Sequence, residues 1–300
     1  MSELTNWRGV FPAVTTKFNN EGEIDLVAMG EHLEMQLEAG VHGIIVLGSL
    51  GENSTLDMAE KRDIIRYFSE RIDGRVPLLA CIAESGTREA LALLNGATDD
   101  GADGFMLLPP MRYASDQRET LEYLSTIGLE SSLPIMLYNN PIAYGTDLLP
   151  ADFSTLSTVE SFVAIKESAA DPRRFADIRR ECGDRYALFC GVDDLAFECF
   201  AMGAVGWVAG LVVAFPRETV RLFELMRAGE WDQARKIYEW FLPLLHLDIG
   251  PKFVQQIKLV EALHGVGTAA VRAPRLALSE KESARVREIY QLAMASRPPV

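Results

Sequence analysis

The chain is poor in the residues that most often bind metals. Among its 300 residues are four cysteines, Cys81, Cys182, Cys190 and Cys199. They have no paired spacing, and three lie inside apolar runs, as buried thiols commonly do. We therefore expect a reducing, cytoplasmic compartment. The four histidines, His32, His42, His246 and His264, show no metal-ligand spacing, so we expect no metal site.

The sequence also lacks long apolar runs and a surplus of positive charge. No apolar stretch reaches the roughly 18 residues that a transmembrane helix needs, so no contact with a membrane is expected. The first residues have no basic segment followed by an apolar one, which argues against a signal peptide. A net charge of −14 argues against a nucleic acid as partner, since few cations can replace its counterions.

What the chain does contain is enough apolar material for a large core, because 48% of its residues are hydrophobic. Short apolar runs recur, and their starts lie 19 to 34 residues apart, as strand–helix–strand units require. The expected strands are residues 9–14, 43–47, 77–81, 104–108, 134–137, 162–165, 187–190 and 206–209.

Helical patterns fill several of the gaps between these runs. They cover residues 25–39, 55–71, 87–99, 116–129 and 217–228. Eight buried strands alternating with helices predict an α/β fold of the (β/α)8 TIM-barrel type, occupying residues 1–225. An open doubly wound sheet is the alternative, but no Gly-x-Gly-x-x-Gly turn follows the first strand. Residues 226–300 are expected to form a C-terminal helical extension, with helices near 231–246, 251–264 and 279–295.

Lys166 stands at the end of the sixth apolar run. A lysine in that position can be desolvated, and a neutral amine can attack a carbonyl carbon to form a Schiff base. The alternative is a lysine that reaches solvent or pairs with Glu167. Context favours the first interpretation, because Tyr138 ends the fifth strand and Gly48 follows the second, and strand ends meet at one rim of a barrel.

Two of these neighbours have structural as well as functional interpretations. The segment Gly48-Ser49-Leu50-Gly51-Glu52 is either an ordinary strand–helix turn or a set of backbone N–H groups that binds an anion. Tyr138 either caps the core through its hydroxyl or moves protons beside the lysine amine.

Four segments together resemble the dihydrodipicolinate synthase and N-acetylneuraminate lyase superfamily of Schiff-base-forming barrels. They are Gly48-Ser49-Leu50-Gly51-Glu52, Tyr138-Asn139-Asn140-Pro141, Ile165-Lys166-Glu167-Ser168 and Gly191-Val192-Asp193-Asp194. The resemblance implies a catalytic Lys166 that forms the Schiff base and a catalytic Tyr138 that relays protons. It implies that Ser49, with the N–H groups of Ser49 and Leu50, holds the carboxylate of a small-molecule substrate. It also places Gly48, Gly191 and Val208 in the pocket, and implies a homotetramer without a cofactor.

Three positions depart from the synthases within this superfamily. Leu50 stands where a threonine is usual, so a relay through that hydroxyl is missing. Met111 replaces a tyrosine that synthases share across a subunit contact, and Ala143 replaces an arginine that binds the semialdehyde carboxylate. These replacements make lysine biosynthesis the less favoured role.

The loops look most like the pyrroline-4-hydroxy-2-carboxylate deaminase branch, which acts in hydroxyproline breakdown. We therefore expect a Schiff-base lyase that dehydrates and deaminates this cyclic imine to 2-oxoglutarate semialdehyde and ammonia. The enzymatic alternatives are 4-hydroxy-tetrahydrodipicolinate synthase and a 2-keto-3-deoxy sugar-acid aldolase or dehydratase. A barrel that binds a 2-oxo acid without turnover is the non-enzymatic alternative.

Overall fold

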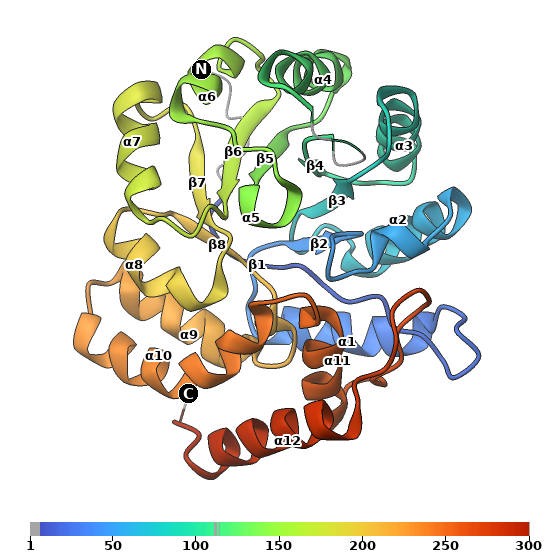
Figure 1. The fold of residues 1–300 in the computed structure, drawn as a ribbon, viewed down its shortest axis with the longest axis vertical. Coiled ribbons are helices and arrows are strands. Elements are labelled where there is room, and N and C mark those ends of the chain that lie inside the picture. The colour runs from blue at the N-terminus through green and yellow to red at the C-terminus, as the bar shows by residue number, and fades with distance from the viewer. Residues whose placement is uncertain (1–6, 111–112, 114, 300) are drawn as a thin grey trace.

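The computed structural model describes residues 7–110, 113 and 115–299. Met111 lies outside the described residues. Eight parallel strands form one sheet in the order β1-β8-β7-β6-β5-β4-β3-β2. The two end strands are joined where Ala13 bridges Ile45 and the Val14 N–H donates to the Ile45 carbonyl at 2.9 Å, which closes the barrel (Figure 1). The predicted (β/α)8 TIM barrel is thereby confirmed.

Each of the eight predicted apolar runs coincides with one strand, although β3, β5 and β6 extend one or two residues beyond the prediction. The strands are β1 (Gly9–Pro12), β2 (Ile44–Val46), β3 (Leu78–Ile82), β4 (Gly104–Leu107), β5 (Ile135–Asn139), β6 (Phe162–Glu167), β7 (Ala187–Cys190) and β8 (Gly206–Ala209). Nearly all of their side chains are buried, as expected for strands covered on both faces.

Helices surround the barrel on the outside. They are α1 (Leu26–Glu38), α2 (Met58–Ile72), α3 (Thr87–Asp99), α4 (Gln117–Glu130), α5 (Pro141–Tyr144), α6 (Pro150–Leu156), α7 (Arg173–Cys182), α8 (Ala196–Ala201) and α9 (Pro216–Arg227). Short 3-10 turns also follow several strands: η1 (Asn53–Thr55), η2 (Asp193–Leu195) and η3 (Leu211–Val213). Helix α2 begins three residues later than predicted, because Asp57 and Glu60 form a capping box at its start.

The C-terminal helices pack against one side of the barrel, below α1 and α9 in Figure 1. They are α10 (Trp231–Leu245), η4 (His246–Asp248), α11 (Phe253–Leu263) and α12 (Glu280–Ala295). The predicted extension is therefore present. Helix α9 ends at Arg227, so the boundary proposed after residue 225 falls in its last turn. The division into two parts at that point stays a prediction.

Buried ion pairs join these C-terminal helices to the barrel. Lys258 and Glu261 of α11 pair with Glu52 and Lys17, both at 2.6 Å, and all four side chains are at most 1% exposed. Glu52 has a left-handed backbone with φ of 57°, which is unusual for a residue with a side chain. The contact with Lys258 therefore holds the loop after β2 against α11.

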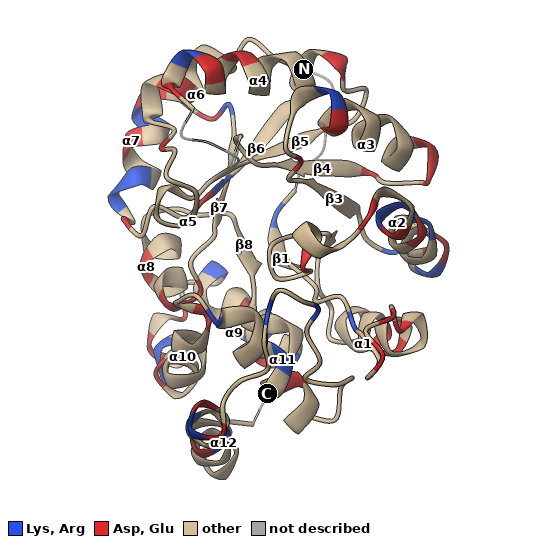
Figure 2. Ribbon diagram, turned by 45° about the vertical axis from the view of Figure 1, so that its right-hand side comes forward, with Lys and Arg blue, Asp and Glu red and all other residues tan. Residues whose placement is uncertain are grey.

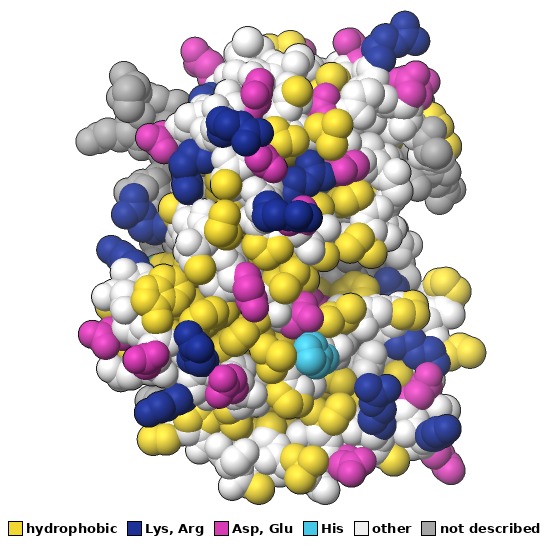
Figure 3. All heavy atoms as spheres, turned by 60° about the vertical axis from the view of Figure 1, so that its left-hand side comes forward, with side chains coloured by type: hydrophobic (Ala, Val, Ile, Leu, Met, Phe, Trp, Pro, Cys, Tyr) yellow, Lys and Arg dark blue, Asp and Glu magenta, His cyan; other side chains and the backbone are white. Residues whose placement is uncertain are grey.

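Charged side chains of both signs lie mainly on the outer helices (Figure 2). On the face shown in Figure 3, acidic and basic side chains are interspersed among hydrophobic ones. This mixed distribution is typical of a soluble surface rather than a basic binding face. Within the described residues, no helix is long and apolar enough to cross a membrane, and no group of three or more metal-ligating side chains occurs.

Candidate active site

Lys166 and Tyr138 are neighbours across two adjacent strands. They are register partners in the β5–β6 pairing, which brings both side chains to the same level of the barrel. The Lys166 Nζ lies 3.9 Å from the centre of the Tyr138 ring, and each residue is 7% exposed. The amine thus lies over the ring face, while the phenolic oxygen accepts a hydrogen bond from the Asn140 side chain at 3.0 Å.

Burial shifts the proton affinity of both groups. It lowers the pKa of the Lys166 amine, although the charges of Tyr144 and Asp248 partly oppose this shift. It raises the pKa of Tyr138 to about 12, so this phenol keeps its proton at neutral pH. A buried amine that loses its proton readily, beside a phenol that retains one, is suited to carbonyl attack followed by proton transfer.

Glu167 is not the partner of Lys166. Its carboxylate accepts hydrogen bonds from the Asn139 side chain at 3.2 Å and from the Ala169 N–H at 2.7 Å. Successive residues of a strand point to opposite faces, so Glu167 faces away from the side that Lys166 occupies. Burial raises the pKa of Glu167 to about 7. The alternative of a Lys166–Glu167 ion pair is therefore wrong.

A second tyrosine, which sequence reasoning missed, completes the site. Tyr144 packs edge-on against Tyr138, with ring centres 5.6 Å apart at 88°, and its hydroxyl lies 2.5 Å from the Ser49 hydroxyl. The neighbouring Tyr144 hydroxyl lowers the pKa of Tyr138, although burial has the larger, opposite effect. The Tyr144 hydroxyl thus joins Ser49 by a hydrogen bond, its ring packs on Tyr138, and neither contact needs a hydroxyl at position 50.

The one-turn helix α5 carries Tyr144 back toward the barrel. Asn140 caps its start by accepting from the Ala143 N–H at 3.0 Å, and Pro141 occupies the first turn. Gly145 ends the helix with a φ of 75°. The Asn-Pro start and the glycine end were visible in the sequence and could have indicated this turn.

The loop after β2 presents backbone donors beside these hydroxyls. Among the described residues, neither the Ser49 N–H nor the Leu50 N–H donates a hydrogen bond to a backbone or side-chain acceptor. The Leu50 side chain is 4% exposed and belongs to the core. A Cβ on Gly51 would lie 3.1 Å from the Val14 carbonyl, so the loop approaches β1 closely. The two unused N–H groups can hold a carboxylate.

Gly191 lies directly against Lys166. Val208 belongs to β8, which is separated from the β6 strand of Lys166 by β7. A Cβ on Gly191 would come within 2.8 Å of the Lys166 Cγ and 2.0 Å of the Ser168 hydroxyl. The absence of a side chain at this position therefore makes room for Lys166. Val208 is buried in β8 opposite Phe11 of β1, and its contact with substrate stays a prediction.

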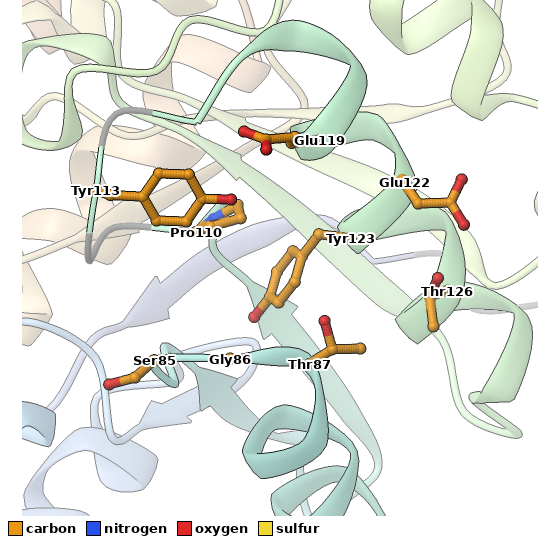
Figure 4. A pocket seen from close by; sticks show the side chains of 9 residues that line it. All are labelled: Ser85, Gly86, Thr87, Pro110, Tyr113, Glu119, Glu122, Tyr123 and Thr126. Atoms are coloured by element: carbon orange, nitrogen blue, oxygen red, sulfur yellow. The ribbon is translucent and has the colours of Figure 1, made fainter.

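A separate hollow lies between the starts of α3 and α4 (Figure 4). It is lined by Gly86, Thr87, Tyr113 and Tyr123, among others, and does not include Lys166 or Tyr138. The Tyr123 hydroxyl has no hydrogen-bond partner within the described part of the chain. The Lys166 amine and the two phenols packed edge-on therefore define the candidate active site, and this hollow does not belong to it.

A buried lysine on β6 of a (β/α)8 barrel, with phenols and hydroxyls at the same rim, is the arrangement of Schiff-base-forming lyases. The model of the dihydrodipicolinate synthetase family matches residues 6–293. The chain belongs to that family, whose members are enzymes of the class I aldolase type.

Curated relatives and solved structures cover nearly the whole chain. A 4-hydroxy-tetrahydrodipicolinate synthase from Acidithiobacillus ferrooxidans is 32% identical, with 94% of this chain and 97% of the relative covered. The synthase from Methylacidiphilum fumariolicum superposes with a TM-score of 0.93 at 26% identity, covering 97% of both chains. A prophage protein of the same family from E. coli K12, solved with pyruvate, has a TM-score of 0.90 at 26% identity, covering 97% of this chain and 99% of its own.

Proposed function

We propose that the protein is a Lys166 Schiff-base lyase that dehydrates and deaminates Δ1-pyrroline-4-hydroxy-2-carboxylate. The observation that carries the proposal is the buried Lys166 amine 3.9 Å from the Tyr138 ring centre, beside unused backbone donors at Ser49 and Leu50. The donors bind the substrate carboxylate, and the amine attacks the adjacent imine carbon. In this substrate the carboxylate is attached directly to the imine carbon that the amine attacks.

The reaction proceeds through an adduct on Lys166. Attack on C2 followed by cleavage of the C2–N bond opens the ring and leaves a protonated imine between Lys166 and C2. This imine withdraws electrons, so C3 loses a proton and the C4 hydroxyl leaves as water. The opened substrate is then a conjugated imine on Lys166, with the freed amine attached to C5.

Two hydrolyses finish the reaction. Tautomerisation converts the C5 amine into a C5 imine. Water then hydrolyses this imine, which releases ammonia, and hydrolyses the C2 imine, which frees the Lys166 amine. The net change is one substrate plus one water to 2-oxoglutarate semialdehyde plus ammonia. Tyr138, with Tyr144 and Ser49, carries the protons of carbinolamine formation and breakdown.

The electrostatics near the lysine favour this substrate over the synthase reaction. Two carboxyl groups, Asp193 and Asp248, act on the Lys166 amine. Ala143 offers no cation to a second carboxylate, which an incoming semialdehyde acid would bring. The cyclic imine carries a neutral hydroxyl instead of a second carboxylate, so Asp193 and Asp248 do not repel it there.

The second candidate is 4-hydroxy-tetrahydrodipicolinate synthase, because relatives at 28% to 32% identity have that name. The same Lys166 and Tyr138 would serve it, with pyruvate as the first substrate. The two candidates differ only after the lysine adduct has formed, so product analysis separates them.

The experiment compares three reactions of the purified enzyme. We expect ammonia release from pyrroline-4-hydroxy-2-carboxylate, and little condensation of pyruvate with aspartate semialdehyde or pyruvate release from keto-deoxy sugar acids. Condensation as the dominant activity, without ammonia release, would establish the synthase instead. Borohydride should trap a 2-oxo acid on the wild type and on K236A, an exposed control on α10, but not on K166A.

A further inference from the structure

Asp248 brings a carboxyl group from outside the barrel to the lysine. It is the last residue of η4, between α10 and α11, and is partly buried. Lys166, Tyr138 and Tyr144, in contrast, come from barrel strands and the loops that follow them. The charge of Asp248 acts on Lys166 and on Tyr138, so the carboxyl lies within electrostatic reach of both reacting groups.

Gly210, directly after β8, makes room for this carboxyl. A Cβ built on Gly210 would lie 2.9 Å from the Asp248 Oδ1 and 3.1 Å from its Cγ. Real Cβ atoms essentially never come within 3.0 Å of another heavy atom, so the Asp248 carboxyl would have to shift. The backbone of Gly210 has an ordinary φ of −88°, so close approach, and not strain, is what a side chain here would disturb.

Three carboxyl groups occur in this region, and they differ in their partners. Asp193 accepts hydrogen bonds from the Trp207 side chain at 3.0 Å and from the Leu211 N–H at 2.7 Å. Asp194 lies 3.7 Å from the His246 ring. Among the described residues, none donates a hydrogen bond to the Asp248 carboxyl. Asp193 is thus occupied in holding the end of β8, whereas Asp248 can contact a substrate.

We infer that Asp248 takes the C3 proton of the Lys166-bound substrate and returns it to the departing C4 hydroxyl. The electron pair of the C3–H bond moves into the C2–C3 bond and neutralises the iminium nitrogen. The same electrons then form the C3–C4 double bond as the C4–O bond breaks, and the hydroxyl leaves as water with the proton from Asp248. Asp248 ends as the carboxylate with which it began. This role rests on the proposed function.

Changes of charge at the Lys166 nitrogen favour both proton transfers, first from C3 to Asp248 and then from Asp248 to the C4 hydroxyl. Burial and the neighbouring Asp193 raise the pKa of Asp248 in the free enzyme. Formation of the cationic imine on Lys166 favours the carboxylate form, which is the base. Once the C3 proton is taken, the imine charge disappears, and the acid form is favoured until the hydroxyl leaves.

Pyruvate allows the first half of this role to be tested apart from the proposed substrate. In D2O, the wild-type enzyme should exchange the methyl protons of pyruvate through the Lys166 adduct, as measured by NMR. D248N should slow this exchange by about 100-fold or more, the scale of general base catalysis. Borohydride should still trap pyruvate on Lys166 in D248N, because the reacting amine is present, so the loss should fall on exchange. D232N, an exposed carboxyl change on α10, should exchange as the wild type does.

A second variant displaces the carboxyl without removing it. G210A places a methyl group 2.9 to 3.2 Å from the atoms of the Asp248 carboxyl, and should also slow exchange, while D248N/G210A should be no slower than D248N alone. Wild-type exchange rates in D248N would overturn the role of Asp248. With pyrroline-4-hydroxy-2-carboxylate, D248N should lower kcat by a similar factor with KM nearly unchanged. Asp248-dependent exchange in an enzyme that releases no ammonia would overturn the proposed function while supporting the proton transfer.

Discussion

The Tyr144 hydroxyl lies 2.5 Å from the Ser49 hydroxyl, and both belong to the same subunit. Ser49 follows β2 and Tyr144 ends α5, so the contact spans the rim of the barrel. Burial raises the pKa of Tyr144, and this phenol therefore stays protonated and can pass a proton on without becoming charged.

Removing the Tyr144 hydroxyl should therefore slow turnover. Y144F keeps the ring that packs on Tyr138, and we expect kcat to fall by about 10- to 100-fold, within the range of proton-transfer contributions. The yield of borohydride-trapped adduct at long times should change little. Y67F on α2 serves as the control, since Tyr67 lies on the outer ring of helices. Equal kcat in Y144F and Y67F would contradict the relay.

Gly191 should tolerate no side chain. In G191A the new methyl group would overlap the Ser168 hydroxyl and crowd the Lys166 side chain at 2.8 to 2.9 Å. We expect the rate of adduct trapping with pyruvate to fall by about 100-fold, because a displacement of about 1 Å at a reacting amine costs that much. In G86A the new methyl group meets only the flexible end of Glu89, so that variant should trap normally. Normal trapping in G191A would show that Lys166 has room to move.

Glu167 should make the fold less stable as the pH rises. Its folded-state pKa of about 7 lies above the 4.5 of an ordinary glutamate, so the folded state binds the proton more tightly. The free energy of unfolding should then decrease between about pH 4.5 and pH 7, by about 3 kcal/mol for this group at most. Urea unfolding of the wild type and E167Q across this range measures the difference in slope.

E167Q has no titrating group at this position and should lose that part of the slope. The surface variant E70Q on α2 changes the same charge without burial, and should keep the wild-type slope. If E167Q and wild type respond to pH in parallel, the carboxylate is not the group that destabilises the fold on ionisation.

Breaking the Lys258–Glu52 pair should be costly. K258M removes the 2.6 Å partner of the buried Glu52 carboxylate and leaves it the Arg275 guanidinium at 3.6 Å, so the cost should reach at most the about 3 to 5 kcal/mol of a broken buried pair. The double variant K258M/E52Q should recover part of this loss, since the uncompensated charge is gone. K252M removes the exposed Lys252–Glu282 pair and should change the free energy of unfolding by less than about 1 kcal/mol. Urea unfolding at neutral pH provides the comparison.

The position of Lys166 could be predicted from the sequence because strand periodicity and strand ends are local properties. An apolar run followed by a lysine places the amine at a strand end, and parallel strands bring their ends to one rim. Helices α5, α6, α7 and α8 were not predicted, and α5, α6 and α8 have only four to seven residues, which show too little periodicity to recognise. Tyr144 was missed for that reason.

The sequence by itself determined the eight strands, the closed barrel and the lysine–tyrosine pair, because each depends on the spacing of apolar residues along the chain. Only the tertiary structure decided that Tyr144 folds back onto Ser49, that Glu167 faces Asn139 instead of Lys166, and that Asp248 reaches the rim from the C-terminal helices. These contacts join segments distant in the sequence, and packing, not periodicity, brings them together.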